Sequence, residues 1–384
     1  MEEWNRDILI NLLDSLIDYR GKTPKKTSSG VPLVTAKIIK GGRILPFEEF
    51  IAEDNYDSWM VRGLPQPGDV VLTTEAPLGE VAQLDNTKVA LAQRVVTLRG
   101  KKGILDNTYL KYFLQSDIGQ KRLIARETGT TVTGIKQSEL RKVEVSYPDF
   151  DTQCRIASIL KSLDDKIALN NRINHNLEDF LLSLYGRLLD SQCGSSTIGQ
   201  VSERVYSGGT PDTKNSDYWG GTINWLSSGE TSNHFIIDTE KRITENGVLH
   251  SSTKFASKYD VVIASAGQGN TRGQTSMTLL DTCINQSVIV IHANTYEAPI
   301  VFCSLANRYD ELRAISDASS IRGSLTTKMI SALEIPVFPE VETFKFASQA
   351  KCIIDQVENN LRENRSLTMM RDSLLPKLMR GGLS

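Results

Sequence analysis

The sequence predicts an α+β protein with two similar mixed α/β domains separated by two long antiparallel coiled-coil helices in a pseudo-twofold arrangement. Three observations predict this fold class. The chain has 384 residues, which suits two domains of ordinary size. Short motifs recur in the same order at a nearly constant offset, and each set ends in a long segment with the apolar spacing of a coiled coil.

An internal duplication defines the expected domains. Four motifs recur at offsets between 187 and 191 residues: Tyr19–Pro24 as Tyr206–Pro211, Gly68–Leu72 as Tyr259–Ile263, Thr130–Gly134 as Ser319–Gly323, and Val143–Val145 as Leu333–Ile335. Each match is short, but their common order and offset indicate two related halves. We therefore expect domains at 1–150 and 191–341, with helical segments at 151–190 and 342–380.

Each expected domain contains β-branched runs and one amphipathic segment. Glycine and polar residues fill the connections between them. The predicted strands are Val31–Thr35, Asp69–Thr73 and Val95–Leu98 in the first half, and Ile223–Leu226, Asp260–Ala264 and Ser287–Ile291 in the second; the predicted helices are Thr108–Arg126 and Ala298–Ala314.

The segment Thr152–Leu189 predicts one long helix, because it has no proline and its apolar residues follow steps of four and three. At about 1.5 Å per residue it would be about 57 Å long. A second, less apolar seam lies 190 residues further along the chain. The first seam is Ile156, Leu160, Leu163, Ile167, Asn170, Asn174, Leu177, Leu181, Leu184 and Leu188; the second is Phe346, Ala350, Ile353, Val357, Asn360, Asn364, Leu367, Arg371, Leu374 and Leu378.

Two asparagines occupy the middle of each seam and indicate the direction of pairing. An asparagine in a coiled-coil seam sets the register, because its amide needs a polar partner opposite. Antiparallel packing would place Asn170 opposite Asn364 and Asn174 opposite Asn360. A parallel arrangement with these amides facing solvent is the alternative.

Composition indicates a globular chain without a metal site. The sequence is 40% hydrophobic and 23% charged, and it contains neither an apolar run of membrane-spanning length nor a signal peptide. We expect a cytoplasmic protein without membrane contact. The five cysteines and four histidines are scattered, so we expect reduced thiols and no metal.

Positive charge is concentrated near the N-terminus, although the net charge is -2. Seven basic residues and no acidic residue lie between Arg20 and Arg43. Such a cluster favours phosphate binding, and a solvated loop is the alternative. Two related modules about one DNA turn (about 34 Å) or more apart, in opposed orientation, would suit a bipartite DNA target.

These features resemble the specificity subunits of type I restriction-modification systems over nearly the whole chain. The segments Tyr19–Pro24, Val31–Ala36 and Gly68–Val71 are similar to the start of a target-recognition domain of that family. Gln153–Leu160 with Leu163–Ile167 resembles the opening of its spacer helix, and Leu374–Leu378 its closing signature. The second helix departs from the pattern, with Phe346–Gln349 at its opening.

The resemblance implies a non-catalytic subunit that binds double-stranded DNA, two methyltransferase subunits and, in the full complex, two motor-nuclease subunits. S-adenosylmethionine, ATP and magnesium would be bound by those partners, and no cofactor by this chain. Each recognition domain would bind one half of a split, asymmetric site, and the methyltransferases would modify an adenine in each half.

Catalytic motifs are missing from the sequence. It contains no Pro-Pro pair for an adenine methyltransferase motif and no phosphate-binding loop, and the glycines of Gly267–Gly273 are misplaced by one residue for dinucleotide binding. One alternative is a nuclease that uses Glu75, Glu80 and Asp85. A second is a coiled-coil scaffold that joins two protein-binding domains.

Polar loop residues are the candidates for DNA contacts, with plain surface or turn roles as the alternative. We interpret Gly21, Gly134, Gly208 and Gly323 as turn formers, and Trp59, Trp219 and Trp225 as core residues rather than base-stacking ones. Ile159, Phe180 and Leu182 lie off the seam and could contact either partners or the modules. The DNA-binding candidates are Lys22, Lys25, Lys37, Thr74, Gln93, Arg94, Thr131 and Lys136 in the first half, and Thr210, Lys214, Ser228, Gln268, Asn270, Arg272, Gln286 and Arg322 in the second.

Overall fold

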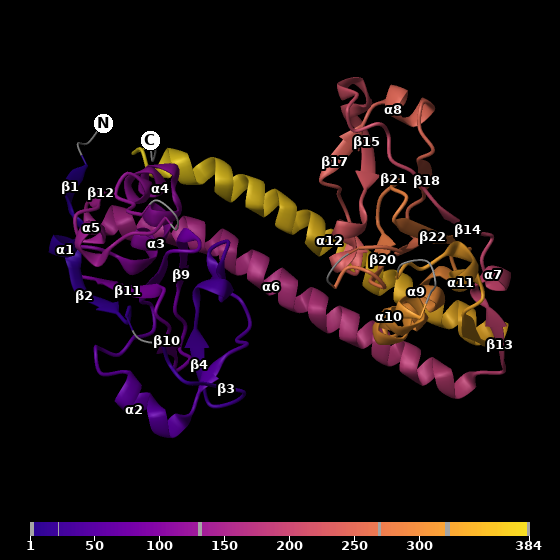
Figure 1. Cartoon of the computed structure of the whole chain (residues 1–384), viewed down its shortest axis with the longest axis horizontal. Helices are drawn as coiled ribbons and strands as arrows, with labels where there is room; N and C mark the ends of the chain where they lie inside the picture. The colour runs from indigo at the N-terminus through magenta and orange to yellow at the C-terminus, as the bar shows by residue number, and fades with distance from the viewer. Residues whose placement is uncertain (1–3, 22, 130–132, 268–269, 319–322, 382–384) are drawn as a thin grey trace. The chain divides into compact units, whose positions relative to one another are not determined.

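The computed structural model describes residues 4–21, 23–129, 133–267, 270–318 and 323–381. Contacts divide the chain into unit 1, residues Met1–Ile167 with Ser366–Ser384, and unit 2, residues Ala168–Arg365. Each unit consists of a module of short strands and helices, together with segments of the long helices α6 (Phe150–Leu188) and α12 (Glu340–Leu378) (Figure 1). The structure confirms the mixed α+β class and both long helices.

The module of unit 1 is built on two four-stranded sheets, an antiparallel one in the order β2-β11-β8-β9 and a mixed one of shorter strands in the order β10-β4-β7-β3. Its elements are β1 (Asn5–Ile8), α1 (Leu9–Leu12), β2 (Leu13–Asp18), β3 (Lys26–Thr27), β4 (Val31–Val34), η1 (Ala36–Ile38), β5 (Ile39–Lys40), β6 (Arg43–Ile44), β7 (Phe50–Ile51), η2 (Glu53–Asn55), α2 (Tyr56–Trp59), β8 (Val70–Thr74), β9 (Leu78–Gln83), β10 (Ala90–Leu91), β11 (Val95–Gly100), α3 (Asn107–Gln115), α4 (Asp117–Ile124), α5 (Gln137–Leu140) and β12 (Glu144–Tyr147).

The module of unit 2 has the corresponding sheets β14-β22-β19-β20-β16 and β17-β15-β21-β18. Its elements are η3 (Leu189–Ser191), β13 (Gly194–Thr197), α7 (Ile198–Val201), β14 (Arg204–Ser207), η4 (Ser216–Tyr218), β15 (Trp219–Leu226), η5 (Ser228–Ser232), β16 (Phe235–Ile236), β17 (Lys241–Ile243), α8 (Glu245–Leu249), β18 (Lys254–Ala256), β19 (Val261–Ala264), β20 (Thr275–Thr278), β21 (Thr282–Ile284), β22 (Val288–His292), α9 (Ala298–Ala306), α10 (Tyr309–Asp317), α11 (Thr327–Ser331) and β23 (Glu334–Val337).

The two modules share a topology that matches the sequence duplication. β10 pairs with β4 in parallel in unit 1, as β21 does with β15 in unit 2. β1 pairs with β12 antiparallel, as β13 does with β23. All six predicted strands are present, with ends shifted by a few residues. The β-branched runs predicted β8 and β19 correctly. Both strands are buried along their whole length, and branched side chains pack well in such strands.

Each of the two predicted module helices is broken in the structure, so the prediction of single helices was wrong. In unit 1, Ser116 is extended and its hydroxyl accepts a hydrogen bond from the Gly119 amide at 3.2 Å, which starts α4 anew. In unit 2, α9 ends at Ala306, and Arg308 donates to the Glu334 carbonyl at 2.8 Å. The Ser116 cap is a polar bond that apolar spacing does not encode.

The long helices bury the predicted seams. In unit 1, Ile156 and Leu160 of α6 lie in the same core cluster as Leu378 of α12. In unit 2, Leu181 and Leu188 of α6 share a core with Phe346, Ala350, Ile353 and Val357 of α12. No helix in the described part of the chain is long and apolar enough to span a membrane.

Candidate nucleic-acid interface

A threonine and a glutamine join two loops in unit 1. The Thr23 hydroxyl donates a hydrogen bond of 2.6 Å to Gln93 Oε1. Thr23 belongs to the first repeated motif, whereas Gln93 lies in the turn between β10 and β11, where the Val95 amide donates to the Ala92 carbonyl at 3.4 Å. This bond attaches the motif to the end of the parallel β10–β4 pair.

The same bond occurs in unit 2. The Thr210 hydroxyl donates to Gln286 Oε1, and Gln286 lies in the equivalent turn between β21 and β22. There the Val288 amide donates to the Asn285 carbonyl at 3.3 Å. We call each bonded pair a Thr–Gln clasp. Thr23 was not among our candidates, although its place in the repeated Thr-Pro motif was a signal that could have identified it.

Several further candidates of unit 1 lie around its clasp. Arg94 is exposed and forms an ion pair of 2.8 Å with Glu75. Glu75 in turn forms a β-bridge with Gly134, and exposed Lys136 lies two residues further on. Thr74 is buried, and its side chain therefore does not face solvent. Arg94 and Lys136 are thus exposed residues of two segments that Glu75 connects.

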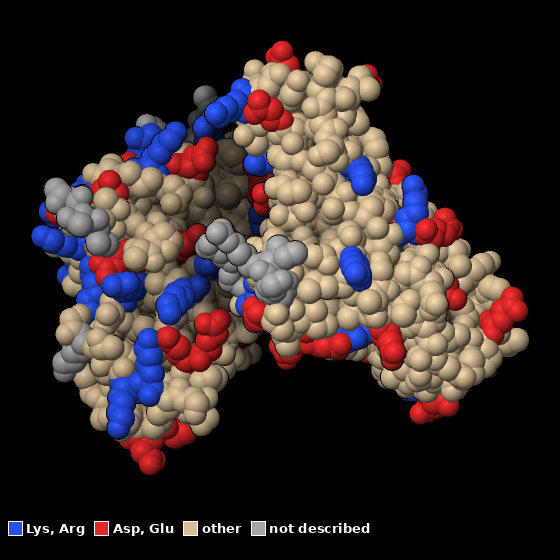
Figure 2. Space-filling view, turned by 45° about the vertical axis from the view of Figure 1, so that its right-hand side comes forward, with Lys and Arg blue, Asp and Glu red and all other residues tan. Residues whose placement is uncertain are grey.

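The basic cluster near the N-terminus is partly neutralised. Arg20 pairs with Asp18 and donates to the Ile135 carbonyl, and Lys26 pairs with Glu49 at 2.8 Å. Lys25, Lys37, Lys40 and Arg43 are exposed, and the described part of the chain offers them no ion pair. Figure 2 shows that lysine and arginine gather on the visible face of unit 1, whereas the visible face of unit 2 is less charged.

The candidates of unit 2 differ in how exposed their side chains are and in whether these are bonded to other residues. Lys214 and Asn270 are exposed, Gln286 is exposed within its clasp, and Ser228 is half-buried at the start of η5. Arg272 is mostly buried. Its guanidinium donates to the Gly323 carbonyl at 2.6 Å and pairs with Asp317, so it connects the β19–β20 loop to the segment after α10.

Four candidates, Lys22, Thr131, Gln268 and Arg322, lie outside the described residues, as does most of the repeat Thr130–Gly134 and Ser319–Gly323. The tryptophans occupy the expected packing positions. Trp59 stacks on Tyr19 with ring centroids 5.5 Å apart, and Trp219 meets Trp225 edge-on at 5.0 Å. Of the off-seam residues, Leu182 packs on the core of unit 2, whereas Ile159 and Phe180 are exposed.

Two of the four expected turn glycines serve another purpose. Gly21 and Gly323 have positive φ, as a turn former should. Gly208 does not, but a Cβ there would lie 2.1 Å from the Ile284 carbonyl oxygen, and one on Gly134 would lie 2.9 Å from that of Thr74. At these two positions glycine permits close backbone approach instead of a turn.

The seam asparagines bond in the antiparallel sense within unit 2. Asn170 Nδ2 donates to Asn364 Oδ1 at 2.9 Å, and Asn360 Nδ2 donates to Asn174 Oδ1 at 2.8 Å. Asn364 Nδ2 also donates to Asn171 Oδ1 at 2.8 Å, a contact that the seam pattern did not predict. All four seam asparagines are nine-tenths buried or more, so these amides have little access to water.

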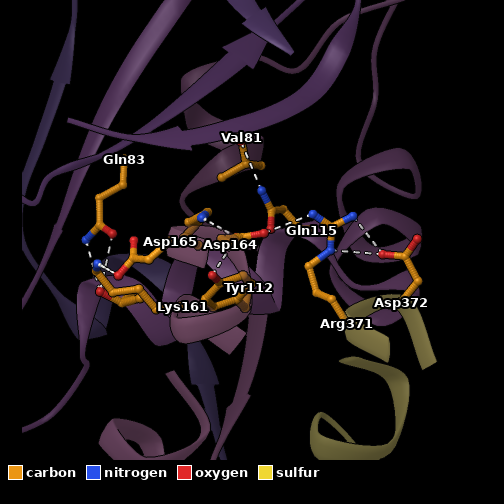
Figure 3. Close-up of polar contacts among 11 residues, drawn as sticks. Val81, Gln83, Tyr112, Gln115, Lys161, Asp164, Asp165, Arg371 and Asp372 are labelled. Atoms are coloured by element: carbon orange, nitrogen blue, oxygen red, sulfur yellow. Dashed lines mark hydrogen bonds and ion pairs between the residues drawn. The ribbon is translucent and has the colours of Figure 1, made fainter. Parts of the chain in front are cut away.

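A partly buried polar junction in unit 1, which the sequence pattern did not reveal, centres on Asp164 of α6. Its carboxylate accepts from Lys111 Nζ at 3.1 Å, Tyr112 Oη at 2.6 Å and Arg371 Nη1 at 2.9 Å (Figure 3). Burial opposes ionisation of Asp164, but Lys111 and the hydrogen bonds of Tyr112 and Arg371 outweigh it and lower the Asp164 pKa. Burial lowers the pKa of Lys111, although Asp164 opposes this shift. The junction attaches α3 and α12 to α6.

The carboxylates of the nuclease alternative have separate partners. Glu75 pairs with Arg94, Glu80 accepts from the Gly41 amide at 3.0 Å, and Asp85 accepts from the Thr87 amide at 2.8 Å. Within the described ranges, no three His, Cys, Asp or Glu residues form a cluster able to hold a metal ion.

Comparisons with known proteins agree with this architecture. The family described as "Type I restriction modification DNA specificity domain" matches residues 21–179. The chain is 23% identical over 363 residues to the Type I restriction enzyme MjaIX specificity subunit of Methanocaldococcus jannaschii, covering 88% of this chain and 82% of that protein. It is 20% identical over 357 residues to the HindI specificity subunit of Haemophilus influenzae, covering 72% and 75%.

A solved structure has the same fold. The type I restriction-modification S subunit from M. genitalium superposes with a TM-score of 0.67 at 18% identity, covering 98% of this chain and 96% of that one. Together with the family match and the curated relatives, the duplicated modules and long helices indicate a non-catalytic DNA-specificity subunit. These matches identify the chain as a DNA-specificity subunit of a type I restriction-modification system, part of a complex that binds DNA.

Proposed function

We propose that this subunit recognises a bipartite DNA target, with residues 1–150 and 191–341 as its two target-recognition domains. Segments 151–190 and 342–380 would act as its spacer helices. The observation that supports this most directly is the Thr–Gln clasp, formed by Thr23 with Gln93 and again by Thr210 with Gln286. Because the same clasp occurs in both domains, each domain is suited to bind its own DNA segment.

The side chains around the two clasps differ. Lys25, directly after the first motif, corresponds to Asp212, and Arg94 beside Gln93 corresponds to Ser287 beside Gln286. Since base and phosphate contacts depend on side-chain chemistry, a shared frame with different flanking residues supports two different half-sites.

The exposed candidates are the proposed DNA contacts. Lys25 and Lys37 would bind phosphates, whereas Arg94, Lys136, Lys214 and Asn270 have side chains able to contact base edges. Gln93, Gln286 and Thr210 would shape the contact surface through the clasps. Thr74 and Arg272 have buried or internally bonded side chains, so their role in recognition would be to support loops. Ser228 is a further proposed contact.

The partners follow from the family. We propose that the chain directs two methyltransferase subunits, and in the full complex two motor-nuclease subunits, to its target. S-adenosylmethionine, ATP and magnesium would be bound by those subunits. The seam asparagines Asn170, Asn174, Asn360 and Asn364 would fix the register of the spacer helices, because each pair bonds across the seam.

The test is the methylated sequence. The chain is co-expressed with its methyltransferase partner, and modified adenines in the host DNA are mapped by sequencing. Two short specified segments separated by a fixed number of unspecified base pairs are expected. A single continuous motif, or methylation without sequence preference, would contradict the proposal.

A further inference from the structure

The contact between α6 and α12 has different chemistry in the two units. In unit 1, Arg371 Nη1 lies 2.9 Å from Asp164 Oδ1 (Figure 3). The offset of 190 residues that relates the two helices maps Asp164 onto Ile354 and Arg371 onto Leu181. In unit 2 those two residues are each 1% exposed and belong to one apolar core. The position that holds an ion pair in unit 1 is therefore occupied by two buried aliphatic residues of one core in unit 2.

The offset is supported by contacts on the outer faces of the helices. Lys161 pairs with Asp165 at 2.5 Å on α6, and Lys351 pairs with Asp355 at 2.6 Å on α12, at positions 190 residues apart. The seam asparagines follow the same offset. The difference at Asp164 and Arg371 is thus a departure from an otherwise matched pair of helices.

The asparagines cannot select which helix pairs with which. Two α6 helices from separate copies, packed antiparallel in the same register, would place Asn170 opposite Asn174. Two α12 helices would place Asn360 opposite Asn364. Every one of these pairings offers each amide an amide partner, so the asparagines set register but leave the choice of partner open.

The charged pair does distinguish the pairings. An α6–α6 pair would oppose Asp164 with Leu181, and an α12–α12 pair would oppose Arg371 with Ile354, each twice by symmetry. Asp164 would keep Lys111 and Tyr112, and Arg371 would keep its neighbour Asp372, at 2.8 Å. The α12–α12 pair is therefore the least favourable, because the partly buried guanidinium of Arg371 would lose Asp164 and face the aliphatic Ile354.

We propose that Asp164 and Arg371 make helix pairing selective, so that α6 fits α12 and fits poorly against α6 of a second copy, as α12 does against a second α12. The interface thereby favours α6–α12 pairing over exchange that joins like helices of two copies. If each module binds its own half-site as proposed above, exchange would join identical modules and convert an asymmetric target into a symmetric one.

The experiment uses the full chain and a second copy of it as the probe. Two preparations with different affinity tags are mixed, unfolded in urea and refolded together. The fraction carrying both tags is then measured by successive affinity steps and light scattering. The test variant is Lys111→Met, Asp164→Ile and Arg371→Leu together, because Lys111→Met removes the buried ammonium that loss of Asp164 would leave without its carboxylate. The matched control is Lys161→Gln with Asp165→Asn, which removes an exposed ion pair from the same helix.

Wild type and control are expected to refold as monomers. The triple variant is expected to raise the two-tag fraction on the order of ten-fold, increasingly at higher protein concentration. A triple variant as monomeric as wild type would overturn the proposal. Should the triple variant fail to fold, Arg371→Leu alone is tested, since it leaves Asp164 with Lys111 and Tyr112. A rise in its two-tag fraction supports selective pairing, and an unchanged two-tag fraction overturns it. The assay needs no DNA, so its result is independent of the proposed target.

Discussion

The phenol oxygen of Tyr259 donates a hydrogen bond of 3.1 Å to Asp355 Oδ1 of helix α12. Tyr259 has a φ of 75°, in the left-handed region, at the position where the first module has Gly68 with a φ of 86°. A tyrosine in this conformation is strained. Its ring centroid also lies 5.7 Å from Nζ of Lys351 on the same helix, so the contacts with α12 offset the backbone strain.

Tyr259→Ala is therefore expected to be less stable than Tyr259→Gly, by about 1 kcal/mol, because only glycine adopts the left-handed backbone without strain. Urea unfolding of both variants measures the difference in the free energy of unfolding. Tyr259→Phe serves as the control, since it retains the strain and the ring but loses the hydrogen bond to Asp355. Equal stability of the alanine and glycine variants would argue against strain at this position.

The amide contact between Asn170 and Asn364 predicts coupled stability effects. Asn170→Ala should lower the free energy of unfolding by about 1–3 kcal/mol, because it removes a donor from a buried amide network. Asn170→Leu with Asn364→Leu should cost less than the sum of the two single changes, since no buried amide then faces an apolar neighbour. Thermal unfolding of the single and double variants checks this; strictly additive effects would indicate that the two amides do not interact.

The clasps predict effects confined to one half-site. Gln93→Ala frees the Thr23 loop from the β10–β11 turn and should relax sequence preference in one half of the methylated motif. Gln286→Ala should do the same in the other half. Each variant is the control for the other, and mapping of methylated adenines is the measurement. Loss of sequence preference in both halves of the motif in either variant would indicate a general folding defect instead.

The exposed lysines predict a change in salt dependence. Lys25→Ala with Lys37→Ala should reduce the slope of log affinity against log salt by up to about 2, because each lost phosphate contact contributes about 0.9. Lys88→Ala with Lys142→Ala is the matched control, as both lysines are exposed but paired with Glu53 and Glu139. Binding of target DNA by the assembled complex is measured between about 50 and 200 mM salt. An unchanged slope would favour a scaffold over DNA contact by this cluster.

The Asp164 junction predicts loss of stability in acid. Its folded pKa lies below the ordinary aspartate value, because Lys111, Tyr112 and Arg371 together outweigh the cost of burial. A group with a lowered folded pKa stabilises fully above its unfolded pKa of about 4, and this contribution is lost as pH falls through the folded value. The stability difference between wild type and Asp164→Asn should therefore be constant from about pH 7 to 5 and shrink below about pH 4. A difference that does not change with pH would show that the Asp164 charge does not contribute.

Sequence alone predicted the repeated modules and the two long helices, because hydrophobic periodicity and repeated motifs are local properties of the chain. The seam spacing also predicted which asparagines face each other, and the bonds Asn170–Asn364 and Asn360–Asn174 have that direction. Once two helices share a seam and one register, the opposing residues follow by counting.

The tertiary structure decided which polar groups are already occupied. Lys26 and Arg272 are basic loop residues by sequence, but Glu49 and Asp317 neutralise them from other segments. Likewise, the sequence shows Arg371 only as a polar residue in an apolar seam. Its partner Asp164 lies 207 residues away in the chain and is identified only by the fold. Ion pairs of this kind depend on which distant segments meet, and that information is absent from local patterns.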